Sequence, residues 1–321
     1  MKYLIFFTKI FLDAYRDTFR VIKHFKMILI NGFIIVPKLY YIRLFYSFSL
    51  FRNLIKVKLK SNFVFDDYFE DANISSSNLT KTIDEYGHTK TYKLKDELKK
   101  EFIKEIFLNK DLEYKKNTFV DKKKIMKYEN EDLNLYFDRL KKNNISRLTG
   151  FIDLKKENSV RSFLISKPIV SLVQNYLNSE AFSISASFFI STPLEISKKE
   201  KYSNAQFYHW DNDFSKFLKL YIYLTDVDDE SGPHVFIPRT HKKKSFESSL
   251  CRLYEDKLID ELYSNKVKFL GNSGSIFFAD GYGLHKGETP RNKPRLIINA
   301  HFGRNKIFYS NKDIYYKDNL L

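Results

Sequence analysis

Two histidines and an aspartate have the residue types and spacing of a metal site. His209 and Asp211 are two residues apart, and on a β-strand that spacing puts both side chains on one face. A strand-like run, 275–279, leads toward His285 and makes it the natural third ligand. Two imidazoles and one carboxylate on one side of an ion leave the other side open, as in the facial triad of non-haem iron(II) oxygenases. The alternative is a hydrogen-bonded surface pair, because an H-x-D triplet alone is a weak signal.

An arginine follows the third ligand at a position that suits a second binding group. Arg295 comes ten residues after His285 and opens an alternating strand that runs to Phe302. A guanidinium buried beside a metal site can bind a carboxylate through two hydrogen bonds. Arg291 competes for this role, but it lies in the loop 289–294, so strand placement favours Arg295. A metal triad with a carboxylate clamp is what a 2-oxoglutarate-dependent oxygenase requires.

The segments around these residues come in a recognisable order: His209-x-Asp211, Leu224–Asp228, Glu230–Pro233, Ile237–Lys242, Gly274–Phe278, His285 and Pro294–Leu296. In order and spacing they resemble the phytanoyl-CoA dioxygenase family of Fe(II)/2-oxoglutarate oxygenases. The resemblance covers about a third of the chain closely, and extends more loosely from about residue 160 onward.

The resemblance implies a set of cofactors and site residues. Iron(II) is expected on His209, Asp211 and His285, with 2-oxoglutarate and O₂ at its open positions and the far carboxylate of 2-oxoglutarate on Arg295. The family places an aromatic residue near the co-substrate at the position of Tyr221, and often a polar residue near it at the position of Trp210. The resemblance therefore implies that Tyr221 and Trp210 contact the co-substrate. Halogenating relatives replace the carboxylate ligand by a small residue, so Asp211 favours hydroxylation, or a related desaturation or cyclisation.

Three features depart from the family pattern. Arg239 stands where a glycine is common in the turn before His241, Trp210 replaces the polar residue, and the gap from His285 to Arg295 is about one residue short. In the family, the residue at the position of His241 closes a turn and does not bind metal. His234 is likewise expected to be structural. None of these departures removes a ligand.

Short strands separated by turn signals predict the fold. The runs that alternate in the manner of strands are about 183–192, 206–211, 217–226, 234–237, 266–270, 274–279 and 295–302. This rhythm indicates a double-sheet jelly roll, and the resemblance implies the same double-stranded β-helix, or cupin-like, core flanked by helices. The protein is therefore expected to be mixed α and β, with helices around 94–107, 131–142 and 160–179, the last interrupted at Pro168.

Two regions are expected along the chain. Residues 1–60 are predicted to form a basic amphipathic helical extension, with a helix over 2–26 whose apolar side carries Phe7, Phe11, Phe19 and Phe25. Residues 61–321 are predicted to form the catalytic domain, with a jelly-roll core at about 160–303. The longest uncharged run in the extension is too short to span a bilayer. The extension either packs on the catalytic domain or lies on an anionic membrane surface.

Charge and cysteine content restrict the class of protein. The net charge is +16, but residues 1–60 hold 12 Lys and Arg against two Asp, a net of +10. This concentration at one end argues against a nucleic-acid-binding face on the main domain.

Cys251 is the single cysteine, which excludes an internal disulfide and indicates a reducing, cytoplasmic location. Weak attachment to the membrane surface through the basic extension is the alternative location.

The function expected from the sequence is an Fe(II)- and 2-oxoglutarate-dependent dioxygenase. It would hydroxylate a C–H bond of a small-molecule, lipid-linked or carrier-linked metabolite and release succinate and CO₂. The alternatives are a non-catalytic jelly-roll binding protein and a cupin-like metal-dependent isomerase.

Overall fold

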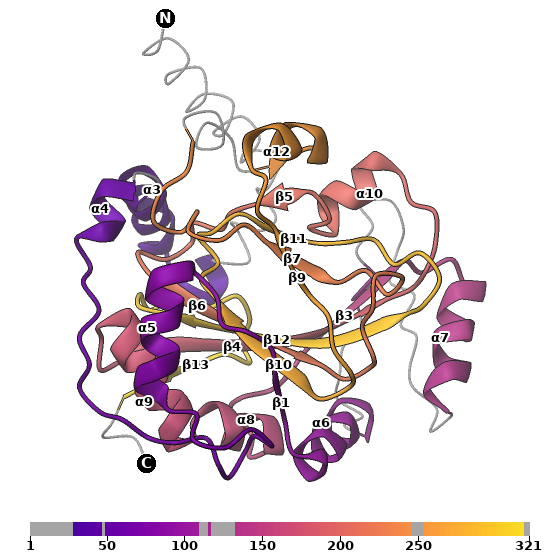
Figure 1. Cartoon of the computed structure of the whole chain (residues 1–321), viewed down its shortest axis with the longest axis horizontal. Coiled ribbons are helices and arrows are strands. Elements are labelled where there is room, and N and C mark those ends of the chain that lie inside the picture. The colour runs from indigo at the N-terminus through magenta and orange to yellow at the C-terminus, as the bar shows by residue number, and fades with distance from the viewer. Residues whose placement is uncertain (1–27, 47–48, 109–114, 117–131, 246–252, 318–321) are drawn as a thin grey trace, which may run out of the picture.

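Two antiparallel sheets form the centre of the protein (Figure 1). The structure is a computed structural model and describes residues 28–46, 49–108, 115–116, 132–245 and 253–317. In this part of the chain the major sheet has the strand order β1-β10-β6-β12-β4-β3-β2, with β13 also paired to β4. The minor sheet has the order β8-β5-β11-β7-β9. This is the double-stranded β-helix expected from the sequence.

The strands of the major sheet are β1 (Tyr92–Lys93), β2 (Lys115–Lys116), β3 (Arg147–Phe151), β4 (Phe182–Ser191), β6 (Phe217–Tyr223), β10 (Ser275–Ala279), β12 (Arg295–Gly303) and β13 (Ile314–Tyr316). Those of the minor sheet are β5 (Tyr208–His209), β7 (His234–Phe236), β8 (Leu253–Tyr254), β9 (Val267–Phe269) and β11 (His285–Gly287). The major sheet therefore extends beyond the core predicted at 160–303.

Alternation along β6 divides the major sheet into two faces. Leu220 and Ile222 lie on its outer face in the largest apolar cluster, whereas Tyr221 and Tyr223 face the minor sheet. The register extends this division, because Tyr221 pairs with Asn299 of β12 and with Phe277 of β10, and directly paired residues point to the same side. The inner face is thus rich in polar and aromatic side chains, and the outer face is aliphatic.

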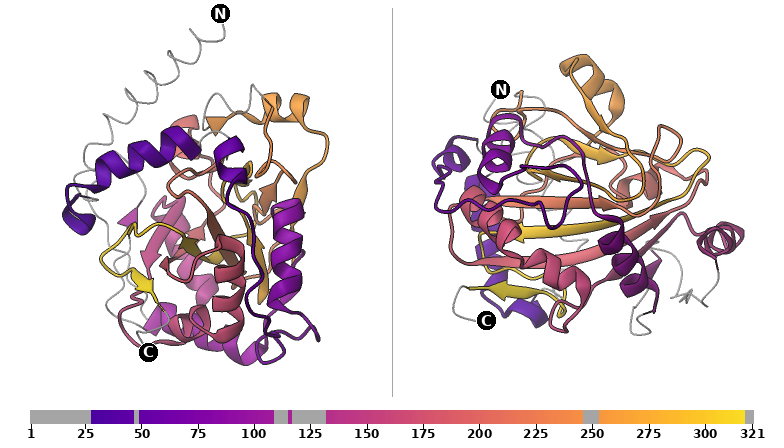
Figure 2. Two further views of the ribbon diagram at one scale, coloured as in Figure 1. Left: turned by 90° about the vertical axis from the view of Figure 1, so that its left-hand side faces the viewer. Right: turned by 60° about the horizontal axis from the view of Figure 1, so that its bottom comes forward.

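Helices cover the outer face of the major sheet (Figures 1 and 2). They are α5 (Ser76–Tyr86), α6 (Asp96–Leu108), α7 (Leu133–Lys142), α8 (Ser159–Leu164) and α9 (Lys167–Leu177). Local signals set their ends: the Ser75 hydroxyl accepts from the Asn78 amide at the start of α5, and Gly87 ends that helix with a φ of 87°. The break predicted at Pro168 is confirmed, because α8 ends before it and α9 begins with this proline in its first turn.

Further helices of the described chain lie around the minor sheet and toward the N-terminus: α3 (Ile35–Tyr46), α4 (Ser49–Asn53), α10 (Lys198–Ser203) and α12 (Asp256–Leu262). Ile35, Leu39 and Ile42 of α3 are buried in an apolar cluster that also holds Tyr208 and Trp210. Figure 2 shows α3 and α4, in indigo, on the outside of the sheets. Side-chain contacts fasten this segment, since Arg43 pairs with Asp213 at 2.9 Å and Asn31 exchanges hydrogen bonds with the backbone of Phe308.

The helix predicted over 2–26, with its four phenylalanines, lies outside the described residues. No helix among the described residues has the length and apolar character that crossing a bilayer requires.

Candidate metal centre

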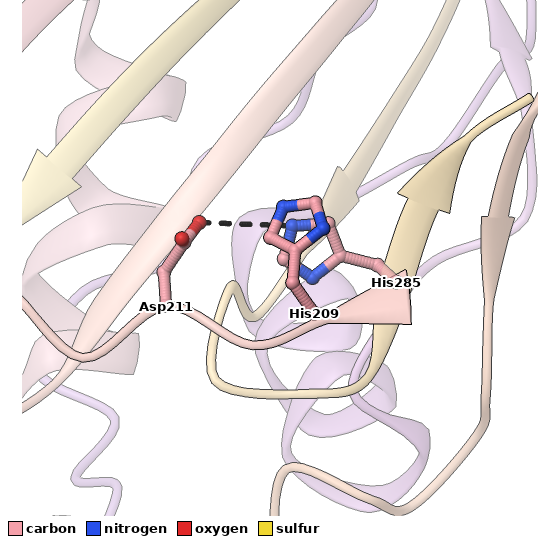
Figure 3. Close-up of side chains that lie close together, drawn as sticks. All are labelled: His209, Asp211 and His285. Carbon is pink, nitrogen blue, oxygen red and sulfur yellow. Dashed lines mark ion pairs between the residues drawn. The ribbon is translucent and has the colours of Figure 1, made fainter. Parts of the chain in front are cut away.

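The minor sheet brings the two histidines face to face. His209 on β5 pairs directly with His285 on β11, and their ring centroids are 4.3 Å apart. Asp211 follows two residues after His209, and its amide donates to the Gly281 carbonyl at 2.8 Å, which holds the chain beside the loop before β11. Figure 3 shows the three side chains converging from these two segments. One ligand atom from each lies within 4.8 Å of the others.

Backbone carbonyls orient both imidazoles for metal binding. His209 Nδ1 lies 2.8 Å from the Phe207 oxygen, and His285 Nδ1 lies 2.8 Å from the Gly283 oxygen. Because a carbonyl oxygen only accepts, each Nδ1 carries the proton and each Nε2 keeps its lone pair. Burial, followed by the nearby positive charge of Lys219, lowers the pKa of His285 well below its ordinary value. The donor set of two neutral imidazoles and a carboxylate therefore fits iron(II).

A lysine that sequence reasoning did not single out lies against this donor set. Lys219 points inward from β6, and its ammonium forms an ion pair with Asp211 and lies 3.2 Å from His285 Nε2. Burial favours the neutral amine, but the charge of Asp211 and the contacts of Tyr221 outweigh it, and the pKa of Lys219 is raised. The signal in the sequence was a lysine at an inward position of an apolar strand.

Tyr221 and His234 form the next layer of side chains. Tyr221 is buried, is hydrogen-bonded to Lys219 and stacks on Phe277 at 5.0 Å between centroids. The ring of His234 lies 4.4 Å from that of Tyr221 and 5.4 Å from that of His285. His234 is thus a neighbour of the triad and lies outside the three-residue ligand group.

Arg295 lies inside the protein at one end of the same space. Its Nη1 donates to the Gly232 carbonyl. Its Nη2 lies against Gly287, so close that a Cβ atom added to this glycine would be 3.2 Å from it. Gly287 follows two residues after His285, a step of about 7 Å along the strand and onto the same face. That step is similar to the length of a five-carbon dicarboxylic acid. The rival Arg291 is exposed by 68% and lies near Glu230 on the surface.

Trp210 differs from its expected position. Strand alternation turns its ring away from the face that carries His209 and Asp211, into the apolar cluster beneath α3. There it meets Tyr282 edge-on at 5.2 Å between centroids. Trp210 supports the strand from behind, and its position does not support a contact with the co-substrate.

His241 occupies the turn expected for it. It is buried, and its Nε2 lies 3.0 Å from the Asp84 carbonyl at the end of α5. The turn residue Arg239 adopts a φ of 66°, a conformation more usual for the glycine found there in the family.

Solved structures with a similar arrangement are distant in sequence. They include SnoN, a non-haem α-ketoglutarate-dependent epimerase from nogalamycin biosynthesis, with 13% identity and a TM-score of 0.47 over 71% of this chain and 80% of that one. They also include HygX from Streptomyces hygroscopicus with nickel, 2-oxoglutarate and hygromycin B bound, with 11% identity and a TM-score of 0.48 over 71% and 87%. No curated protein sequence matches the chain.

The assignment rests on a family sequence model. The model described as phytanoyl-CoA dioxygenase (PhyH) matches residues 109–295, which is more than half of the chain. The match takes in the three candidate metal ligands and ends at Arg295. This chain belongs to the phytanoyl-CoA dioxygenase family.

Proposed function

We propose that the protein hydroxylates a C–H bond of a small-molecule, lipid-linked or carrier-linked metabolite. Membership of the family makes it an Fe(II)- and 2-oxoglutarate-dependent enzyme; the reaction outcome and the substrate class are the proposed part. One observation carries the proposal: a two-histidine, one-carboxylate donor set shares its strand with Gly287, and the buried Arg295 lies against this glycine two residues after His285.

The proposal assigns each residue a task. His209, Asp211 and His285 would hold the iron, and Arg295 would bind the far carboxylate of 2-oxoglutarate. Together with O₂, the bound iron and 2-oxoglutarate supply the oxidant, and succinate and CO₂ are released. Burial raises the pKa of Tyr221, so its hydroxyl stays protonated next to the co-substrate. The stacked rings of Phe269 and Phe277, 3.9 Å apart, give the surroundings of Tyr221 an apolar wall.

Polar side chains on the inner face give a substrate groups to bind. Ser185, His301 and Lys219 form one row across β4, β12 and β6, and Ser187, Asn299 and Tyr221 form the next. The Asn299 amide lies 2.9 Å from His301 Nε2, while its buried oxygen has no partner among the described residues. Such groups suit a metabolite with hydroxyl or amide substituents.

Turnover of 2-oxoglutarate tests the catalytic part. The anaerobically reconstituted iron(II) protein, exposed to 2-oxoglutarate and O₂, should form succinate even without its substrate, and His209→Ala should reduce this to background. Asp229→Ala, which removes an exposed carboxylate paired with Lys268, should keep wild-type turnover. Equal succinate formation by wild type and His209→Ala would reject the assignment.

Two other functions make different predictions. A non-catalytic binding protein or a cupin-like isomerase would not need a carboxylate clamp and should bind iron without binding 2-oxoglutarate. The visible charge-transfer band of the anaerobic iron(II)–2-oxoglutarate complex distinguishes them. The substrate class is tested by mass-spectrometric screening of cell extract for an oxygen-dependent gain of one oxygen atom, which must depend on His209.

A further inference from the structure

A second guanidinium, partly buried, lies beside Arg295. In the register of the major sheet, Ser191 of β4 pairs with Arg295 on one side and with Arg147 of β3 on the other. Directly paired residues on neighbouring strands point to the same side, so the side chains of Arg147, Ser191 and Arg295 form one row on the inner face. Paired Cα atoms are about 5 Å apart, and two arginines flanking a serine can reach the same point with their long side chains.

Contacts with the opposite loop bring the two guanidiniums to the same place. Arg147 Nη1 donates to the Asn204 carbonyl. The next residue, Ala205, accepts from the Gly287 amide at 3.3 Å, and Gly287 is the glycine beside Arg295 Nη2. Both arginines therefore converge where this loop meets β11, two residues after His285 on that strand. After burial, the charge of Arg295 is the next cause that lowers the pKa of Arg147, to about 10.

These two cations lack a counterion in the described part of the chain. Neither forms an ion pair there, and the Nε atoms of both are buried without a hydrogen-bond partner. Glu288, next to Gly287, forms its ion pairs with Lys268 and Lys286, and its charge acts on Arg295 without forming an ion pair with it. Two adjacent positive charges, one buried and one partly buried, are unfavourable unless an anion joins them. His234 Nε2 and the Asn204 side-chain amide are also buried without partners, as expected around a polar ligand.

We propose that Arg147 is a second carboxylate-binding residue of the co-substrate site, and that it binds the far carboxylate of 2-oxoglutarate together with Arg295. This rests on the proposed function. Two guanidiniums surround a carboxylate with more donors than one and fix its direction. The Arg147 side chain is held in place by stacking on Phe189, with the guanidinium carbon 4.1 Å from the ring centroid. It therefore loses little conformational entropy when the ligand binds.

Ligand titrations of anaerobic iron(II) protein test the proposal. The charge-transfer band reports binding of 2-oxoglutarate, and of 2-oxopentanoate, which has the same chain length and metal-chelating end but no far carboxylate. Arg147→Met should weaken 2-oxoglutarate binding by about tenfold to a hundredfold, the range for loss of a charge-assisted hydrogen bond, and leave 2-oxopentanoate within about twofold. Arg291→Met, which removes the exposed arginine of the adjoining loop, should change neither.

Further variants separate a ligand contact from damage to the fold. Arg147→Lys keeps the charge and should bind 2-oxoglutarate with an affinity between those of wild type and Arg147→Met. In the double variant Arg147→Met/Arg295→Met, the loss should be smaller than the product of the two single losses, because both residues bind one carboxylate. Unchanged 2-oxoglutarate affinity in Arg147→Met, or equal weakening of both ligands, would overturn the proposal. If wild-type protein gave no band at all, the proposed function itself would fail.

Discussion

Lys219 places a positive charge against the candidate metal ligands. Its ammonium contacts Asp211 and lies 3.2 Å from His285 Nε2. An imidazole Nε2 has one lone pair, so this nitrogen cannot accept from Lys219 and bind a metal ion at the same time. The lysine must move off His285 when a metal is bound, and its charge then opposes that of the ion.

Replacing this lysine should therefore strengthen metal binding. In Lys219→Met we expect the affinity for Co(II), followed by its visible absorption, to rise by about tenfold or more, because a like charge a few ångströms from the ion is removed. Lys286→Met is the matched control, since Lys286 adjoins His285 in sequence but points away to Asp256 at 2.8 Å. Equal or weaker Co(II) binding in Lys219→Met would show that the lysine does not oppose the metal.

At the residue scale, the sequence identified the residues whose roles follow from motifs. His209, Asp211, His285 and Arg295 could be proposed because their spacing and their strand context are visible along the chain. Arg147 became apparent only from strand pairing, because its partner Arg295 is far away in the sequence. Lys219 became apparent only from the packing of the two sheets, which brings its ammonium to Asp211 and His285. Trp210 was expected in the site by family position, and alternation along β5 places it elsewhere.

At the element scale, helix α4 is joined to the loop that supports the metal centre. Arg52 is buried, donates to the Phe214 carbonyl at 3.0 Å and lies 3.6 Å from Asp280 Oδ1. Its guanidinium also covers Tyr282, at 3.9 Å from the ring centroid. The loop after Asp280 provides the carbonyl that accepts from the Asp211 amide. The N-terminal helices therefore help to hold a candidate ligand.

Removing the Arg52 charge should destabilise the protein strongly. Arg52→Met leaves the buried Asp280 carboxylate without its cation, and breaking a buried pair in this way costs about 3–5 kcal/mol. Arg43→Met is the control, because it breaks the less buried pair with Asp213 and should cost less. Unfolding in urea measures both free energies, and a loss in Arg52→Met no larger than in Arg43→Met would contradict the predicted role.

The turn that follows β7 should make stability depend on pH. Burial lowers the pKa of His241 to about 4, although Asp280 and Asp84 partly offset the effect. The unfolded chain takes up a proton near pH 6.5 and the folded one only near pH 4, so stability is present above pH 6.5 and is lost as the pH falls through this window. The loss for one group is about 3 kcal/mol.

His241→Gln keeps a donor toward the Asp84 carbonyl and cannot titrate. The difference in unfolding free energy between pH 7 and pH 4 should therefore be smaller in this variant than in wild type by about 3 kcal/mol. Comparing the two proteins cancels the contributions of other titrating groups. Parallel stability–pH curves would contradict the prediction.

The sequence predicted elements better than their pairing. The strand at 217–226 and the break at Pro168 followed from periodicity and proline chemistry. Strand β3 was missed because its five residues lie between charged, lysine-rich stretches that read as surface. Its inner-face arginine is nevertheless paired through Ser191 with Arg295, a contact that only the three-dimensional register defines.

At the scale of the whole molecule, the segment that contains the N-terminal helices carries both positive charge and exposed apolar side chains. Residues 28–65 contain no acidic residue, and Lys56 and Lys58 there are exposed. The same segment exposes large apolar side chains, including Phe33 by 84%, Ile34 by 81% and Leu50 by 70%. A segment that combines exposed apolar groups with basic ones is complementary to an anionic membrane surface.

We propose that this surface attaches the enzyme weakly to anionic membranes, near an amphipathic substrate. Each lysine or arginine near such a surface contributes about 1 kcal/mol to membrane binding, and salt screens the effect.

The full chain should sediment with vesicles containing acidic lipid at low salt and be released at high salt. Phe33→Ser/Ile34→Ser should bind less, whereas Leu135→Ser on α7, also exposed by 60%, should bind as wild type. Equal recovery in the supernatant with and without acidic lipid, at both salt concentrations, would leave this segment only its packing role against the sheets.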